Sequence, residues 1–289
     1  DLQQKISEFF AEQGGKHIMK RKKAVTLTTA ALALTMTVCG SSSAIAASEL
    51  TAESKPATQY TIDANQEVYA LLDFEDTEEF ENATKGLIAS PDTLDIYDEN
   101  GKLVWSQTAY AFLDQDAPDT ANPSLWRDTQ LNHIYGLFEV TDGIYQVRGY
   151  DMSNVTFIKG DTGWIVVDPL MSVECAQAAF ALVEENLGSF PVKAVIYSHS
   201  HVDHFGGVKG IVSEEEVQAG NVQVIAPEGF EKHAVSENIY AGTAMGRRAS
   251  YQYGTMLEGG ETGSLAIGIG MGQSKGRTSY ISPTLEITQ

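Results

Sequence analysis

Residues 194–208 read AVIYSHSHVDHFGGV, and this stretch decides the fold and the chemistry that the sequence predicts. Three histidines and one aspartate fall within six positions of it: His199, His201, Asp203 and His204. They follow directly on an apolar run that is typical of a buried strand. The carboxyl ends of such strands form the rim of a sheet, where ligand sites lie. Because imidazole and carboxylate groups are good zinc ligands, the stretch predicts a metal site.

The spacing also predicts how these side chains are presented. On an extended segment, alternation would place His199, His201 and Asp203 on one side, and the next histidine would follow in a turn. Gly206 and Gly207 are expected to give that turn unusual backbone angles. The alternative is that the histidines are ordinary surface or core residues. So dense a cluster is hard to produce by chance in a chain with 6 histidines, and metal binding is favoured.

The segments around this stretch alternate between strand and helix patterns. Short apolar runs bounded by turn residues predict strands, and apolar residues at helical spacing after a Ser or acidic start predict helices. The expected strands are 143–149, 154–160, 163–169, 191–198 and 222–227, and the expected helices are 122–132, 172–188, 214–220 and 228–242. This alternation predicts a layered α/β core. Before it, residues 63–90 predict one or two solvated helices, and residues 47–62 a flexible lead-in.

The composition excludes one class of partner. The chain has 289 residues with 19 Lys+Arg against 39 Asp+Glu, a formal net charge of −20. Nucleic-acid binding requires clustered basic residues, which are absent here, so no nucleic-acid partner is expected. A hydrophobic content of 43%, with 12 Tyr and 11 Phe, is enough for a sizeable core.

The N-terminal residues are expected to lie outside the fold. Residues 19–46 carry a basic start, an apolar stretch and small residues near the end, which predicts a signal peptide cleaved after Ala46 and a periplasmic or secreted protein. Residues 1–18 are interpreted as upstream read-through, with a genuine N-terminal helix as the alternative. Lipid anchoring at Cys39 is a further alternative, which Val38 disfavours. The apolar stretch is short for a membrane span and no later segment is long enough, so no transmembrane span is expected.

The motif H-x-H-x-D-H after an apolar strand resembles the metal motif of the metallo-β-lactamase superfamily. NVTFIKGDTGWIVVDPL (154–170) resembles the opening strand pair of that superfamily, which ends in an aspartate matched by Asp168. The segments 122–132, 143–158, 198–211 and 236–254 together resemble the alkyl sulfatases of the superfamily. The similarity runs from about residue 57 to the C-terminus.

This resemblance implies an α/β fold: the first half of an αββα sandwich. Residues 47–140 would form a family-specific N-terminal extension, and residues 141–289 a metallo-β-lactamase-like domain truncated at its C-terminus. Two zinc ions are implied. His199 and His201 would hold the first, and Asp203 and His204 the second, so that Asp203 also takes part in catalysis. Asp168 would orient the loop without binding metal.

The implied reaction is hydrolysis of a long-chain alkyl sulfate, such as dodecyl sulfate, to an alcohol and inorganic sulfate. Two zinc ions can present a metal-bound hydroxide at neutral pH and receive the anionic ester. The family uses two glutamates and another histidine from further along, whereas the only histidine after His204 is His233. The remaining ligands are therefore expected downstream of residue 289. The chain would be an N-terminal fragment with little or no activity alone, and its parent protein a homodimer.

Two rival functions stay open. Another hydrolase on the same scaffold, a lactamase, a lactonase or a thioesterase, is disfavoured by the long lead-in from Ser48 to Val140. A secreted metal-binding protein without catalysis is the second. Arg247, Arg248 and Tyr251 are expected to line an anionic-substrate pocket, because arginine pairs well with sulfate oxygens. An ordinary helix with exposed charges is about equally favoured for them.

Overall fold

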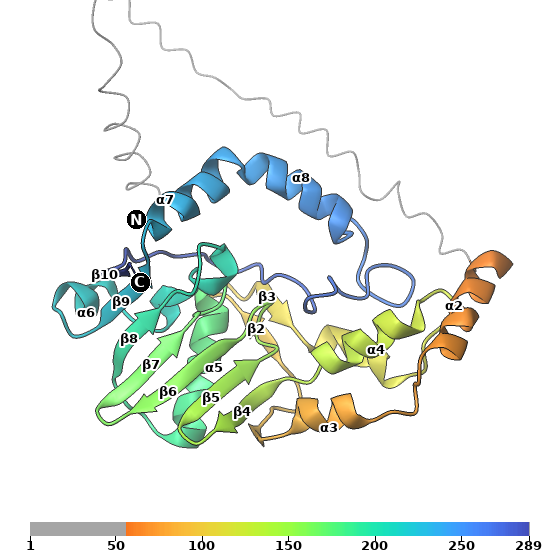
Figure 1. Ribbon diagram of the computed structural model, residues 1–289, viewed down its shortest axis with the longest axis horizontal. Helices are drawn as coiled ribbons and strands as arrows, with labels where there is room; N and C mark the ends of the chain where they lie inside the picture. The colour runs from red at the N-terminus through yellow and green to blue at the C-terminus, as the bar shows by residue number, and fades with distance from the viewer. Residues whose placement is uncertain (1–55, 289) are drawn as a thin grey trace, which may run out of the picture. The chain divides into compact units, whose positions relative to one another are not determined.

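An eight-stranded mixed sheet forms the centre of the computed structural model, which describes residues 56–288 (Figure 1). The strand order is β1-β4-β5-β6-β7-β8-β9-β10; neighbours are antiparallel from β1 to β7 and parallel from β7 to β10. The strands are β1 (Leu87–Ala89), β4 (Gly136–Thr141), β5 (Ile144–Arg148), β6 (Val155–Gly160), β7 (Gly163–Val167), β8 (Val192–Ile196), β9 (Gln223–Pro227) and β10 (Leu285–Ile287). The predicted α/β class is confirmed.

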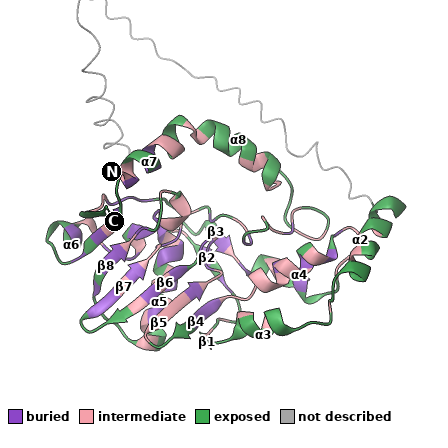
Figure 2. Cartoon of the chain, viewed as in Figure 1, coloured by how far each residue is buried: buried purple, intermediate pink, exposed green. Residues whose placement is uncertain are grey.

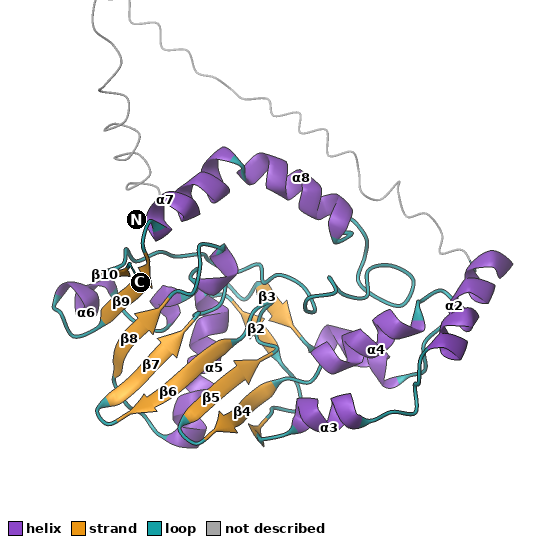
Figure 3. Cartoon of the chain, in the orientation of Figure 1, coloured by secondary structure: helices purple, strands orange, loops and turns teal. Residues whose placement is uncertain are grey.

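The sheet buries one face almost completely. The strands carry many buried residues (Figure 2). Alternation along each strand places Leu137, Val147, Phe157, Trp164, Val166 and Val195, all buried, on this face. Helix α5 (Val173–Leu187) and a two-stranded sheet, β2 (Asp95–Tyr97) with β3 (Leu103–Ser106), pack behind it (Figure 3). The opposite face carries half-buried side chains, including Ile144, Ile158, Ile165 and Ile196.

Strands β7 and β8 are parallel, so the chain must cross from the end of one to the start of the other, and helix α5 makes this crossover. Ser172 stands at its N-cap and Gly188, with φ 92°, ends it, as the sequence predicts. The Ser172 side chain does not cap the helix. Its hydroxyl oxygen lies 2.9 Å from the hydroxyl oxygen of Ser274.

The other helical elements are short. They are α2 (Gln59–Leu71), α3 (Glu78–Thr84), η2 (Thr108–Asp114), α4 (Pro123–Asn132), η3 (Val202–His204), η4 (Val208–Gly210), α6 (Glu214–Gln218), α7 (Phe230–Val235), η5 (Ser236–Tyr240) and α8 (Gly242–Gln252). Three sequence expectations need correction. Residues 59–62, expected to be flexible, begin α2, because Thr58 caps the helix by accepting from Thr61 N. Residues 87–89, expected to be helical, form β1 through pairing with β4. The helix expected over 228–242 is α7 followed by a π-helical turn, η5.

The predicted boundary at residue 140 falls inside strand β4. This strand pairs with β5 on one side and with β1 on the other, so hydrogen bonds of one sheet cross the boundary. Residues from Ala57 onward belong to one compact unit. The division into an extension and a domain therefore stays a prediction.

The expected read-through segment (1–18), signal peptide (19–46) and Cys39 lie outside the described residues. Within residues 56–288, no helix combines the length and apolar character needed to cross a lipid bilayer.

Candidate metal centre

The histidine-rich loop follows the carboxyl end of β8, as the sequence predicts. His199 and His201 are exposed, and the chain bends at residues 199–200 between them, whereas Asp203 and His204 are half-buried. The predicted alternation along an extended segment fails, because residues 199–200 form a bend and residues 202–204 form the 3₁₀ turn η3. Asp203 and His204 are thus presented by a turn.

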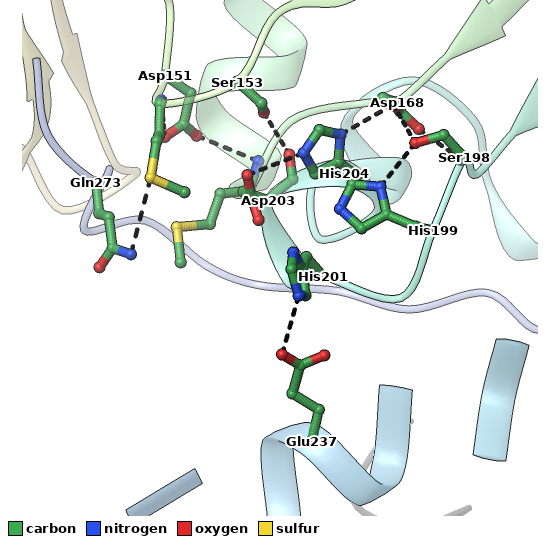
Figure 4. A network of polar contacts seen from close by, with 12 residues as sticks. Asp151, Ser153, Asp168, Ser198, His199, His201, Asp203, His204, Glu237 and Gln273 are labelled. Atoms are coloured by element: carbon green, nitrogen blue, oxygen red, sulfur yellow. Dashed lines mark hydrogen bonds and ion pairs between the residues drawn. The ribbon is translucent and has the colours of Figure 1, made fainter. Parts of the chain in front are cut away.

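The structure brings the three imidazole rings together (Figure 4). The ring centroid of His199 lies 4.1 Å from that of His204 and 4.7 Å from that of His201. Burial lowers the pKa of His199, and the neighbouring rings of His204 and His201 lower it further because two cations would repel. A neutral His199 presents a lone pair, the form in which imidazole binds a metal.

Asp168 ties the two ends of this loop together. It follows β7, and its Oδ1 accepts the backbone N–H of Ser198 at 2.8 Å. Its Oδ2 accepts the Ser198 hydroxyl at 2.6 Å and lies 2.9 Å from His204 Nδ1. Asp168 adopts a φ of 55°, which is uncommon for a residue other than glycine. The contacts that hold this conformation are those that place the loop.

His204 stands between two carboxylates. Its Nδ1 faces Asp168, and its Nε2 lies 3.1 Å from Asp203 Oδ2. Burial by itself lowers the pKa of His204, but hydrogen bonds and charges from Asp168 and Asp203 outweigh burial and raise the pKa to about 9. Burial raises the pKa of Asp203, and the His204 hydrogen bond and charge outweigh this and leave it lowered.

His201 is held from a different part of the chain. Its Nε2 lies 3.0 Å from Oε1 of Glu237, which stands on η5 (Figure 4). No local sequence pattern marks Glu237, because the two residues meet only through the fold. The segment 236–254, which carries it, was among those that resemble alkyl sulfatases, and that is the signal by which it could have been found.

Asp151 anchors the surroundings of the loop. It is 3% exposed, and its carboxylate accepts hydrogen bonds from Met152 N, Met171 N, Ser274 N and Ser274 Oγ. Burial raises its pKa, and these hydrogen bonds oppose the rise. Two residues further on, Ser153 donates its hydroxyl hydrogen to the backbone carbonyl of Asp203. The β5–β6 connection thus holds both the α5 N-terminus and the histidine-rich loop.

Gly206 and Gly207 serve close packing. Neither has a positive φ, so the expectation of unusual backbone angles is wrong. A Cβ on Gly206 would lie 2.2 Å from Met171 O, and one on Gly207 would lie 2.1 Å from Pro169 O. Glycine is needed because the loop passes directly over the backbone that precedes α5.

The predicted substrate residues lie apart from this network. Arg247, Arg248 and Tyr251 are exposed on α8, and Tyr251 is 93% exposed. A cavity of about 370 Å³ adjoins the loop instead, with polar walls from Asn154, Thr156 and Gln146 next to Asp168, Asp203 and His204. A second, more apolar cavity of about 510 Å³ lies between β3 and residues 253–275, with Trp105, Tyr110, Leu257, Ile267 and Met271 in its walls.

The donor set fits zinc by its chemistry, since imidazole and carboxylate are its usual nitrogen and oxygen ligands. In residues 56–288, however, no three side chains of His, Cys, Asp or Glu converge as a metal cage does. Two contacts explain this: His204 Nε2 is turned to Asp203, and His201 Nε2 to Glu237. The assignment of the four ligands stays a prediction.

Residues 148–274 match the metallo-beta-lactamase superfamily. Over these residues the chain is similar to this superfamily, and the curated relatives it resembles are alkylsulfatases. It is 50% identical over 232 residues to a linear primary-alkylsulfatase from Pseudomonas sp., covering 80% of this chain and 34% of the relative. It is 47% identical over 230 residues to the alkyl/aryl-sulfatase BDS1 of Saccharomyces cerevisiae, covering 79% and 36%. The resemblance found in the sequence is confirmed.

A solved structure shares the fold. The stereoselective inverting sec-alkylsulfatase Pisa1 from Pseudomonas sp. is 48% identical and superposes with a TM-score of 0.78, over 82% of this chain and 38% of that chain. The chain thus spans little more than a third of the length of the proteins it resembles.

Proposed function

We propose that this chain belongs to an enzyme that hydrolyses alkyl sulfate esters to an alcohol and inorganic sulfate. The observation that carries the proposal is the identity of about half of all aligned residues to two alkylsulfatases, over about four fifths of the chain. Substrate contacts differ more readily than a fold, so identity at this level over the surroundings of the loop argues for the same class of ester. A lactamase, lactonase or thioesterase activity has no comparable support.

The reaction would depend on two zinc ions, with His199 and His201 holding the first and Asp203 and His204 the second. When bound, zinc supplies positive charge for an anionic ester and lowers the pKa of a water molecule at the site. The chain's own residues prepare the site. Asp168 accepts a hydrogen bond from the Nδ1–H of His204. This contact orients the ring so that Nε2 faces Asp203. Ser153 holds the Asp203 backbone in place.

The cavities suit the two ends of an alkyl sulfate. The polar cavity beside Asp203 and His204 has hydrogen-bonding side chains for a sulfate group. The apolar cavity would receive the alkyl chain, which burial against Trp105, Leu257 and Ile267 stabilises. Gln273, in the wall of the apolar cavity, contacts the sulfur of Met152, in the wall of the polar one, at 4.0 Å.

Arg247, Arg248 and Tyr251 would attract the anionic substrate before it reaches the metal centre. On an exposed helix of an acidic protein, two adjacent guanidinium groups provide a local positive field for an approaching anion. The signal peptide over 19–46 would export the protein to the periplasm or the medium, and the parent protein would be a homodimer.

The test is turnover by the complete product of the gene, loaded with zinc. Sulfate release from dodecyl sulfate is measured beside hydrolysis of a chromogenic lactam, a lactone and a thioester. Sulfate release with little turnover of the other three is the expected result. Turnover of the lactam, lactone or thioester alone would assign another hydrolase. Zinc binding with no turnover at all would favour a metal-binding protein without catalysis.

A further inference from the structure

Asp151 lies between the walls of the two cavities of the proposed site. Residues 152–154, the polar wall, line the cavity beside the histidine-rich loop. Residues 271–275, the apolar wall, line the larger apolar cavity. Asp151 immediately precedes the polar wall in the chain, and its side chain contacts the apolar wall. It therefore stands where the two walls meet.

A single carboxylate joins these walls. Asp151 Oδ1 accepts the backbone N–H of Met152 at 2.8 Å and that of Ser274 at 3.1 Å. Its Oδ2 accepts the hydroxyl hydrogen of Ser274 at 2.6 Å and the N–H of Met171 at 3.3 Å. The apolar wall is thus held through both the backbone and the side chain of Ser274. Four donors on one side chain require a group that only accepts, which is why a carboxylate suits this position.

The apolar wall is also fixed to the rest of its cavity. Tyr110 donates its hydroxyl hydrogen to the carbonyl of Met271 at 2.8 Å. On the opposite side of the cavity, Trp105 Nε1 donates to the carbonyl of Gly149 at 2.8 Å, two residues before Asp151. The apolar cavity is therefore bonded on two sides to the β5–β6 connection.

The polar wall carries this connection to the histidine-rich loop. Ser153 donates its hydroxyl hydrogen to the backbone carbonyl of Asp203, and Figure 4 shows Ser153 beside Asp151 with this bond. A continuous chain of contacts thus runs from the apolar cavity through Asp151 to Asp203. A shift at Asp151 would move one cavity relative to the other.

We propose that Asp151 is a positioning residue that sets where the ester of a long-chain alkyl sulfate lies relative to the metal centre. The proposal rests on the proposed function. A long alkyl chain is held in the apolar cavity by burial, so its ester follows any displacement of the apolar wall. A short chain is held less firmly, and its ester can still reach the metal centre. Because a misplacement of about 1 Å can lower a rate by about 100-fold, the effect of Asp151 should grow with chain length.

A purely structural role would give different kinetics. If Asp151 only stabilised the fold, its loss would lower the amount of active enzyme and reduce kcat for every ester by the same factor. The ratio of kcat for dodecyl sulfate to kcat for a short ester, measured on one preparation, is independent of how much of the protein is folded.

The first experiment measures kcat and KM of the complete, zinc-loaded protein for a series of esters from butyl to dodecyl sulfate, with the shortest ester that the wild type hydrolyses as the reference. In Asp151→Ala the kcat ratio should fall by about 10- to 100-fold, with little change in the KM for dodecyl sulfate. Ser274→Ala should lower the ratio less, because its N–H still reaches Oδ1. Equal losses for all esters in Asp151→Ala overturn the proposal.

Two further variants make the comparison specific. Asp151→Asn should keep most of the ratio, because its amide oxygen can still accept from Met152 N–H and Ser274 N–H. Ser189→Ala is the matched control, since it removes a hydroxyl that donates to Glu184 at the same 2.6 Å, just after α5 and outside both cavity walls. Its ratio should equal that of the wild type. An Asp151→Asn ratio as low as that of Asp151→Ala would overturn the proposal.

The second experiment needs no substrate. Amide hydrogen exchange of the complete protein, followed by mass spectrometry, should be faster across residues 271–275 in Asp151→Ala and across residues 149–154 in Ser274→Ala. Unchanged exchange in the apolar wall of Asp151→Ala overturns the proposal. A wild type that releases no sulfate from any ester contradicts the proposed function and with it the kinetic role of Asp151. Coupled exchange would then show that Asp151 joins the two walls without that role.

Discussion

Asp168 Oδ2 lies 2.9 Å from His204 Nδ1, and the same oxygen accepts the hydroxyl hydrogen of Ser198 at 2.6 Å. One carboxylate at the end of β7 therefore fixes both the beginning and the end of the histidine-rich loop. The backbone of Asp168, with φ 55°, is held in a costly conformation by these contacts. The stability of the loop and its electrostatics depend on the same side chain.

We expect this pair to be visible in the pH dependence of stability of the metal-free chain. Because the pKa of His204 is raised from 6.5 to about 9, its contribution to the free energy of unfolding is fully present below pH 6.5. The contribution is lost as pH rises through about 9. Urea denaturation at a series of pH values across this range, with a chelator present, should show the decline.

Asp168→Asn is the matched variant for this prediction. It keeps the size of the side chain but removes the charge that favours protonated His204, so the pKa of His204 should fall toward 6.5 and the decline should move to lower pH. An NMR titration of His204 reads the pKa directly. An identical pKa in the two proteins would show that Asp168 does not hold the proton.

Asp151→Ala should destabilise the fold by about 2–4 kcal/mol, because it leaves several buried donors without a partner at once. Those donors are Met171 N, Ser274 N and Ser274 Oγ, which come from two separate segments. Glu139→Ala, which removes an exposed carboxylate on β4, should change stability by less than about 0.5 kcal/mol. Urea midpoints of the three proteins make the comparison. Equal midpoints for the two variants would mean that the Asp151 network carries no stability.

Local sequence patterns predicted the elements that carry the site. The apolar run before His199, the N-cap of α5 and the strand pair that ends at Asp168 all appear where they were expected, because each pattern spans one element. Strands β1, β2, β3, β4 and β10 were missed. All but β4 have three or four residues, too few for an alternating pattern, and each is paired with a neighbour. The six residues of β4 are buried at one end and exposed at the other, so they show no alternation either.

The histidine-rich loop can be recognised in the sequence, whereas the side chains that contact it from other segments cannot. Four polar side chains in one loop are visible in the sequence, whereas Glu237, Ser153 and Asp151 reach the loop or its supports from other segments. Such contacts join residues tens of positions apart, and no periodicity records them. The direction of Asp203 was also mistaken, because the 3₁₀ turn η3 replaces an extended strand.

Gly207→Ala tests the close packing of the loop on the segment before α5. Its added Cβ would lie 2.1 Å from Pro169 O and 2.7 Å from Ser172 O, so we expect a loss of about 3 kcal/mol through forced displacement of backbone. Gly246→Ala on α8 is the control, since its Cβ meets nothing within 4 Å. That substitution should stabilise by up to about 1 kcal/mol through helix propensity. Thermal unfolding of both variants reads the difference, and a neutral Gly207→Ala would contradict the packing argument.

The arginine pair on α8 predicts a dependence on salt. In the complete protein, replacing both Arg247 and Arg248 by Ala should raise the KM for dodecyl sulfate at low ionic strength and leave kcat unchanged, because the charges attract the anion and do not touch the reacting atoms. The difference should shrink above about 0.15 M salt, where exposed charges are screened beyond about 8 Å. Lys193→Ala, at an exposed position on β8, is the control. If the KM of the double variant is unchanged at every ionic strength, Arg247 and Arg248 are ordinary surface charges with no part in attracting the substrate.

The 289-residue chain itself is expected to bind zinc and to release no sulfate. A catalytic zinc is held by three protein ligands in well-studied enzymes, whereas the loop offers two for each of the two proposed ions. Neither ion would then be held firmly enough to present water and ester in a fixed geometry. Zinc content after dialysis and sulfate release from dodecyl sulfate, measured for this chain beside the complete protein, make the comparison. Turnover by the chain alone that a chelator abolishes would show that these four ligands are sufficient, and the two-ion arrangement would have to be replaced by a simpler one.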